Sequence, residues 1–220
     1  MPAKNDREYR NMTMTVRDLP DGEDERKIVT GYASTFDEPY LLFSGEGWEY
    51  WEVVDRNAFD KTDMGDVIMQ YDHQGRVFAR TRNNTLEVGT DDKGLFIEAD
   101  LGGTEIGREL FNEIRGGYTD RMSFGFTVNG EFEHREKNES GAVKYTRHIT
   151  SIGKLYDVSA VSIPANDGTS IGADAVTRSI GDLNDGVIAR IQAERLEEEK
   201  LELERRRVEV RVKAMSGGKN

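Results

Sequence analysis

A serine inside an apolar segment is the first candidate for chemistry in this sequence. Ser123 follows a Gly-Gly turn and stands in Arg-Met-Ser-Phe-Gly-Phe, whose apolar residues predict a buried strand. A buried hydroxyl needs a hydrogen-bond partner, and a histidine that acts as a base is one such partner. A serine hydroxyl is a weak nucleophile until an adjacent base removes its proton. Because most serines do no chemistry, Ser123 needs a second residue before it indicates a site.

Three histidines are available as candidate bases. His73 comes just after the predicted buried strand 67–71, at a strand-to-loop transition where a rigid scaffold often places catalytic groups. His134 lies between acids in a charged stretch, and His148 lies within a predicted strand. Position alone therefore favours His73 as the base, although most histidines in proteins have no catalytic role.

An acid inside an apolar run is the third candidate. Asp157 stands in Leu-Tyr-Asp-Val-Ser, and acids are rarely buried unless they are paired. The residues alone favour the alternative, in which Asp157 lies on the solvent face of an edge strand. The surroundings of Ser123 are not the Gly-x-Ser-x-Gly turn of the α/β-hydrolases, because Arg121 stands where that motif has its first glycine.

Other kinds of site have little support in the sequence. A metal site would compete for His73, but there is no His-Glu-x-x-His motif and no cysteine ligand. The Gly-Gly-Thr at 102–104 lacks the lysine of a phosphate-binding P-loop. We therefore expect neither a metal nor a cofactor.

Strands are the elements that must position these groups. The 23 glycines against four prolines favour many turns, and apolar runs or alternation mark the strands. The predicted strands are 11–18, 28–35, 67–71, two between 84 and 101, 122–128, 144–152 and 155–163. Thr104 has the hydroxyl of a helix N-cap, and the glycines at 116–117 end that helix. Residues 130–144 are charged and predict an exposed hairpin or loop. The predicted fold class is β-rich α+β.

The composition changes near residue 180. Between 182 and 215 there is no proline, and nine acids stand against eight lysines and arginines. This pattern predicts a long charged helix with a weak apolar seam, which is either an imperfect coiled coil or a solvated helix. We therefore expect a disordered start at 1–10, a folded domain at 11–178 and a helical extension at 179–220.

Charge and hydropathy restrict the partners. The net charge of −12 argues against a general nucleic-acid binder, because contacts to phosphates need clustered lysine and arginine. No apolar run approaches the ~18 residues of a membrane span, and the N-terminus lacks an apolar signal core. The absence of cysteine fits a reducing cytoplasm. We expect a soluble cytoplasmic protein that binds neither nucleic acid nor membrane, and we leave a homo-oligomer open.

Five blocks of the sequence, taken in order, resemble the prohead protease family of tailed bacteriophages. They are the segments at 31–36 and 56–59, Tyr-Asp-His at 71–73 with 79–81 and 84–86, Asp-Lys-Gly-Leu at 92–95, Met-Ser-Phe-Gly-Phe at 122–126, and Tyr-Asp-Val-Ser-Ala-Val at 156–161 leading to Pro-Ala-Asn at 164–166. The resemblance covers about residues 12–170. No single block is decisive, and the order of all five carries the resemblance.

The resemblance implies both a fold and a set of catalytic residues. The implied fold is a closed or partly open β-barrel with surrounding helices, like the herpesvirus capsid-maturation protease, plus the long C-terminal helix. The implied activity is that of a serine endopeptidase, with Ser123 as nucleophile and His73 as base. Asp157 is the candidate third member, at a position where many relatives are expected to have Glu. The herpesvirus enzymes use a second histidine in that role, which makes His148 its rival.

The resemblance also implies substrates and a place of action. The enzyme would cut the scaffold protein or the scaffolding segment of the major capsid protein inside the immature prohead, in the host cytoplasm, with self-cleavage left open. The charged helix would package the enzyme. The oxyanion hole is not located; the backbone after Val161 and around Gly125 are candidates. Two alternatives remain, a non-catalytic assembly or scaffold protein on the same fold and an unrelated β-rich binding module.

Overall fold

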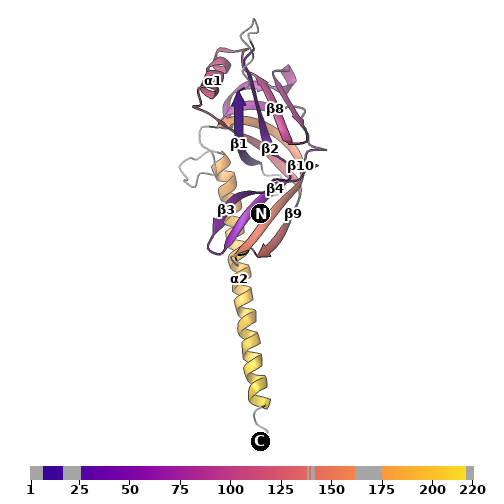
Figure 1. Ribbon diagram of the computed structural model, residues 1–220, viewed down its shortest axis with the longest axis vertical. Coiled ribbons are helices and arrows are strands. Elements are labelled where there is room, and N and C mark those ends of the chain that lie inside the picture. The colour runs from indigo at the N-terminus through magenta and orange to yellow at the C-terminus, as the bar shows by residue number, and fades with distance from the viewer. Residues whose placement is uncertain (1–6, 17–25, 138, 140–141, 162–174, 217–220) are drawn as a thin grey trace. The chain divides into compact units, whose positions relative to one another are not determined.

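The protein is described here from a computed structural model. It describes residues 7–16, 26–137, 139, 142–161 and 175–216 (Figure 1). The contacts of the chain divide it into two units between residues 181 and 182. The first unit holds the strands and one helix, and the second holds most of the C-terminal helix.

Ten strands and two α-helices make up the described residues. The strands are β1 (Glu8–Val16), β2 (Ile28–Thr35), β3 (Tyr40–Gly45), β4 (Trp48–Val54), β5 (Ile68–Tyr71), β6 (Gln74–Arg80), β7 (Leu86–Thr90), β8 (Gly94–Asp100), β9 (Arg121–Lys137) and β10 (Val143–Val161). The helices are α1 (Glu105–Arg115) and α2 (Ala175–Ser216), with a short 3₁₀ turn at Thr81–Asn83. The predicted β-rich α+β class, with a long C-terminal helix, is confirmed.

The strands join in one open sheet. Its order is β3-β4-β10-β9-β1-β2-β8-β7, and β5 pairs with β10 on one side and with β6 on the other. Of the predicted closed or partly open barrel, the closed form is wrong for the described part of the chain, because no pairing joins β3 to β7. Within the first unit, the described residues hold one α-helix longer than two turns, α1. The expected likeness to the herpesvirus fold stays a prediction.

A long hairpin of β9 and β10 forms the middle of the sheet, and in Figure 1 β9 is salmon and β10 orange. In the stretch 130–144, predicted to be an exposed hairpin or loop, residues 130–137 belong to β9 and residues 143–144 to β10. These parts of the two strands pair with each other, and β10 also pairs with β4 there. The two predicted strands 144–152 and 155–163 are one strand in the described residues. Irregular register between Ile149 and Lys154 breaks the apolar alternation there, so the sequence pattern read as two strands.

The core lies where the start of β9 and the end of β10 meet β2, β8 and α1. It holds the apolar residues at alternate positions of these strands and the inner face of α1, including Val29, Leu95, Ile97, Met122, Phe124, Phe126, Leu155, Val158, Leu110 and Ile114. As predicted, Thr104 caps α1, and its hydroxyl accepts a hydrogen bond from the Gly107 amide. Gly117 then takes a positive φ of 73°, which ends the helix.

The first strand begins earlier than the sequence suggested. β1 starts at Glu8, so the prediction of disorder at 1–10 is wrong for residues 8–10. Charged and aromatic residues at 7–10 show no apolar alternation, and that pattern led to the error. Glu8 and Arg10 are nevertheless buried, because they form ion pairs with other strands.

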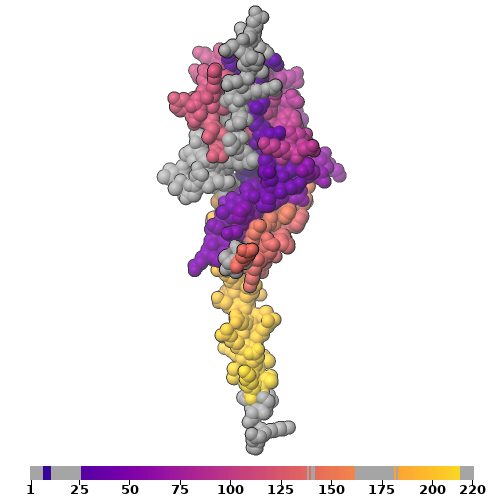
Figure 2. Space-filling view, viewed as in Figure 1, coloured from indigo at the N-terminus to yellow at the C-terminus, as the bar shows by residue number. Residues whose placement is uncertain are grey.

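The C-terminal helix α2 is coloured orange to yellow in Figures 1 and 2. Its large apolar side chains from Leu196 onward are exposed, and they are Leu196, Leu201, Leu203, Val208, Val210 and Val212. Arg206 pairs with Glu202 one turn earlier. No helix in the described ranges is both long and apolar enough to cross a membrane.

Candidate active site

His73 lies in the two-residue turn of the β5–β6 hairpin. Tyr71 pairs with Gln74 across the hairpin, and the two residues between them, Asp72 and His73, both have positive φ, 47° and 57°. Two consecutive residues of positive φ form the tight turn whose twist suits a two-stranded hairpin. Non-glycine residues adopt this conformation at some energetic cost, and such strain is concentrated at functional sites. The Asp72 amide donates to the Ala160 carbonyl at 2.9 Å, which ties the turn to β10.

Ser123 points to the side of β9 that faces away from the core. Side chains alternate along a strand, and Met122, Phe124 and Phe126 belong to the core cluster. Ser123 and Gly125 therefore share the opposite face. Ser123 is fully buried nonetheless, with 0% of its surface exposed. Its strand lies between β1 and β10, which cover both of its edges.

An extra residue in β10 turns Asp157 onto the same face as Ser123. Leu155 and Val158 both lie in the core cluster, although an uninterrupted strand would send them to opposite faces. The register shift between Leu155 and Asp157 inserts Tyr156 and restores the alternation. Asp157 then lies opposite Gly125. β-bulges of this kind often re-aim a side chain beside an active site.

The structure brings His73 and Asp157 into direct contact. Nδ1 of His73 forms a short hydrogen bond with Oδ1 of Asp157, and their side chains are only 1% and 2% exposed. The same Oδ1 accepts a hydrogen bond of 3.0 Å from the Ser159 hydroxyl. The ring is therefore held through Nδ1, and Nε2 is left as the atom that can exchange a proton with a substrate or nucleophile.

Ser123 lies next to this pair without bonding to it. Ser123 is the direct cross-strand partner of Ser159, and such partners have Cβ atoms about 4.5–5.5 Å apart. Both Ser123 Oγ and His73 Nε2 are buried, and neither has a hydrogen-bond partner within the described part of the chain. Catalytic hydrogen bonds are often long without substrate and shorten when it binds. Two unsatisfied polar atoms on one buried face are what a resting serine–histidine pair would present.

The other two histidines lie elsewhere. His148 is nine residues before Asp157 on β10, where its Nδ1 lies 3.1 Å from Asp55 and its ring stacks on Phe132 at 4.5 Å. His134 has a 60% exposed side chain beside Glu136. In the described part of the chain, neither residue forms a hydrogen bond or a ring contact with His73.

Several residues near the site were missed by sequence reasoning. Ser159 could have been found, because it stands two residues after Asp157 and so shares its face of the strand. Gly125 was predicted only as a candidate for the oxyanion hole, and not as the residue opposite Asp157. Arg7 and Tyr9 gave no signal, since they precede the first recognisable strand pattern.

The predicted closing motif and one predicted position of the oxyanion hole cannot be compared with the structure. Pro164, Ala165 and Asn166 lie outside the described residues, and so does the backbone just after Val161, one candidate for the oxyanion hole. Within the described ranges, no group of three or more His, Asp and Glu side chains could hold a metal ion.

Comparison with known proteins adds one finding to this geometry. A search of curated proteins gives no match, and no solved structure matches either. One protein-family model, described as caudovirus prohead serine protease, matches residues 12–185. That range includes Ser123, His73 and Asp157 and covers well over half of the chain. The chain therefore belongs to the caudovirus prohead serine protease family, whose members are serine peptidases of phage capsid maturation.

Proposed function

We propose that this protein is a serine endopeptidase in which Ser123 is the nucleophile, His73 the general base and Asp157 the residue that orients the base. The contact between His73 Nδ1 and Asp157 Oδ1 is the observation that carries this proposal. A carboxylate on Nδ1 fixes the imidazole tautomer, so that the lone pair is on Nε2. Ser123 is the proposed nucleophile because it shares the buried face with this pair and its hydroxyl has no hydrogen-bond partner in the described part of the chain.

The proton transfers follow from this arrangement. His73 Nε2 takes the hydroxyl proton as Ser123 Oγ attacks the carbonyl carbon of a peptide bond. The imidazolium is then stabilised by Asp157, which keeps its negative charge. His73 returns the proton to the leaving amine, which breaks the peptide C–N bond and leaves an acyl-serine. A water molecule, deprotonated by His73, releases the acid and regenerates Ser123.

We propose Asp157 rather than His148 as the third catalytic member because the two side chains have different hydrogen-bond partners. Asp157 contacts the His73 ring directly, whereas His148 is engaged with Asp55 and Phe132. A third member must touch the base to orient it, since orientation acts through that hydrogen bond.

The substrate is a polypeptide of the assembling capsid. Membership of the family makes capsid proteins the substrates, and we propose the scaffold protein or the scaffolding segment of the major capsid protein within the prohead. A hollow of about 490 Å³ lies beside the hairpin that carries His73. It is lined by side chains of that hairpin and of α1, namely Tyr71, Gln74, Arg76, Phe78, Ile106, Glu109, Leu110 and Glu113. Mixed apolar and charged walls suit an extended peptide segment.

A non-catalytic assembly role is the second candidate, and one observation favours it. Ser123 is fully buried and forms no hydrogen bond with His73, so a substrate carbonyl would reach it only after neighbouring groups move. A protein that used the fold for assembly alone would tolerate such a site.

Co-expression with the capsid protein of the same phage tests the proposed function. Mass spectrometry of both proteins should find the capsid or scaffold protein cut at defined bonds. The Ser123→Ala and His73→Ala variants should leave them uncut, because the two residues act as one unit. Full processing by either variant would contradict the assignment, and uncut capsid protein with the parent enzyme would favour the assembly role.

A further inference from the structure

The first strand carries two different sets of side chains on its two faces. Because side chains alternate along an extended chain, Glu8 and Arg10 point to one face of β1. Tyr9, and Arg7 directly before the strand, point to the other. Tyr9 pairs with Gly125 across the β1–β9 ladder. Arg7 and Tyr9 therefore reach the face of the sheet that holds His73, Ser123 and Asp157.

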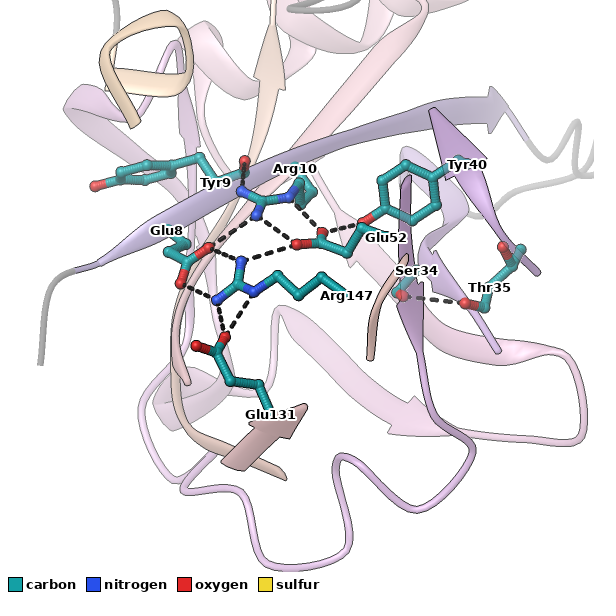
Figure 3. Close-up of polar contacts among 9 residues, drawn as sticks. All are labelled: Glu8, Tyr9, Arg10, Ser34, Thr35, Tyr40, Glu52, Glu131 and Arg147. Carbon is teal, nitrogen blue, oxygen red and sulfur yellow. Dashed lines mark hydrogen bonds and ion pairs between the residues drawn. The ribbon is translucent and has the colours of Figure 1, made fainter. Parts of the chain in front are cut away.

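The opposite face is anchored by a buried ion cluster, drawn in Figure 3. Arg10 donates to both carboxylate oxygens of Glu52 on β4, at 2.5 and 2.7 Å, and to Glu8 at 2.8 Å. Arg147 on β10 donates to Glu8 at 2.7 and 2.8 Å and to Glu52 at 2.9 Å. We call Glu8, Arg10, Glu52 and Arg147 the ion cluster. In Figure 3 the Tyr9 ring points away from it.

The charges of this cluster compensate one another. Burial tends to raise the pKa of Glu8, but hydrogen bonding to Arg147 and the charges of Arg10 and Arg147 outweigh it and lower that pKa to about 2. Burial likewise acts to raise the pKa of Glu52, and the two guanidinium groups hold it below its usual range. Removing one member would leave an uncompensated buried charge, which is strongly destabilising. The cluster therefore fixes the start of β1 firmly onto β4 and β10.

Tyr9 packs against the catalytic histidine. Its ring lies edge-to-face with the His73 ring, with centroids 4.3 Å apart. The same Tyr9 ring also lies close to Gly125, where a Cβ would be only 2.7 Å from its Cε1 atom. His73 sits in a turn of positive φ and would otherwise be held by one hydrogen bond through Nδ1. Tyr9 restricts rotation of the imidazole about its side-chain torsions.

Arg7 lies beside the other oxygen of the orienting acid. Its guanidinium is 3.6 Å from Asp157 Oδ2, and that oxygen has no hydrogen-bond partner in the described part of the chain. The guanidinium also stacks over the Tyr156 ring, 3.8 Å from its centroid. Tyr156 is the extra residue of the bulge that turns Asp157 toward His73. Arg7 therefore contacts both the carboxylate and the residue that aims it.

We propose that β1 is part of the active site, with Tyr9 and Arg7 as positioning residues for His73 and Asp157. The inference rests on the proposed catalytic function of His73 and Asp157 and adds two residues to it. The family match begins at residue 12, so both residues lie outside the matched range. The ion cluster holds the strand, and the strand delivers Tyr9 to the imidazole and Arg7 to the carboxylate.

Saturation kinetics of Ser123 labelling by a fluorophosphonate probe test this proposal. Tyr9→Ala and Arg7→Gln should each lower the limiting labelling rate about tenfold, with little change in the probe concentration for half-saturation, because a misplaced base slows the chemistry. Tyr9→Phe keeps the ring and Arg7→Lys keeps the charge, so both should stay near the parent rate. A low-field proton resonance of His73 Nδ1–H, assigned by its loss in His73→Gln, should shift in Tyr9→Ala and Arg7→Gln.

A matched control separates positioning from general stability. Leu86→Ala removes a buried side chain on β7 and should lower stability, yet its folded fraction should label at the parent rate. Parent-like labelling and an unshifted resonance in folded Tyr9→Ala and Arg7→Gln would overturn the proposal. If Tyr9→Ala does not fold, Tyr9→Leu takes its place. A parent protein that the probe does not label would contradict the proposed function instead, and positioning is then judged by the resonance.

Discussion

Gly125 and Asp157 face each other across β9 and β10, and the carboxylate occupies the space that a side chain at 125 would need. A Cβ built at position 125 would lie 2.5 Å from Asp157 Oδ2, well inside contact distance. The glycine in Met-Ser-Phe-Gly-Phe thus makes room for the carboxylate that contacts His73. The requirement is one of space, since no positive φ is involved at this residue.

Replacing Gly125 with alanine should therefore impair catalysis. The added methyl group would push Asp157 away from His73, and a displacement of about 1 Å can cost ~100-fold in rate. Gly103→Ala is the matched control, because a Cβ there would meet nothing within 4 Å. Probe labelling of Ser123 in both variants gives the comparison. Equal rates in the two variants would mean that Asp157 does not need its present position.

Asp157→Asn should slow cleavage by about 10³ to 10⁴, because the amide favours the wrong imidazole tautomer. His148→Ala should leave the rate close to that of the parent, since His148 bonds to Asp55 instead. The rate of capsid-protein cleavage by each purified variant measures this. If His148→Ala were the slow variant, the third role would pass to that histidine.

The contribution of Glu8 to stability should depend on pH. Its pKa is lowered from 4.5 to about 2 in the folded protein, so folding favours the ionised carboxylate. Glu8 therefore stabilises the fold fully above about pH 4.5, and this stabilisation is lost as the pH falls toward 2. At pH 7, Glu8→Gln should lower the free energy of unfolding by ~3 kcal/mol.

Urea unfolding of the parent and Glu8→Gln at several pH values checks this prediction. The difference between them should shrink between pH 4.5 and pH 2, as the parent loses its advantage. Glu87→Gln changes an exposed glutamate on β7 and should alter stability by less than ~0.5 kcal/mol. A Glu8→Gln deficit that stayed constant down to pH 2 would contradict the role of the ion cluster.

Removing residues 196–220 should leave a folded enzyme. The large apolar side chains of α2 beyond this point are exposed and contribute little to a core. The truncated protein should still react at Ser123 and should enter proheads poorly, because we expect the helix to package the enzyme. Circular dichroism, probe labelling and the protease content of purified proheads give the three readouts. Normal prohead content would place the packaging signal elsewhere.

Candidate site residues could be predicted from the sequence only where their type and their place in the chain pointed to chemistry. Ser123 and His73 stood out by type and by their place relative to apolar strands, and Asp157 gained its role only from the family resemblance. No pattern reveals that Tyr156 is a bulge, because that depends on which face of β10 meets the core. The prediction of Asp157 on a solvent face failed for the same reason.

The fold class could be predicted from the sequence, but whether the sheet closes into a barrel could not. Apolar alternation marks strands, but barrel closure depends on pairing between distant strands, which a single sequence does not encode locally. The start of β1 escaped notice because Glu8 and Arg10 resemble surface residues, and they are buried only through Glu52 and Arg147. Charged residues buried in compensating pairs give no hydropathy signal.

Mapping the site of fluorophosphonate labelling tests the central claim most directly. The parent protein, incubated with the probe and digested, should carry the label on Ser123. His73→Ala and Asp157→Asn should label far more slowly, and Ser123→Ala should not label there at all. Thermal unfolding of each variant would show that the fold is retained. A folded parent protein that takes up no label at Ser123, or a His73→Ala variant that labels at the parent rate, would contradict the account.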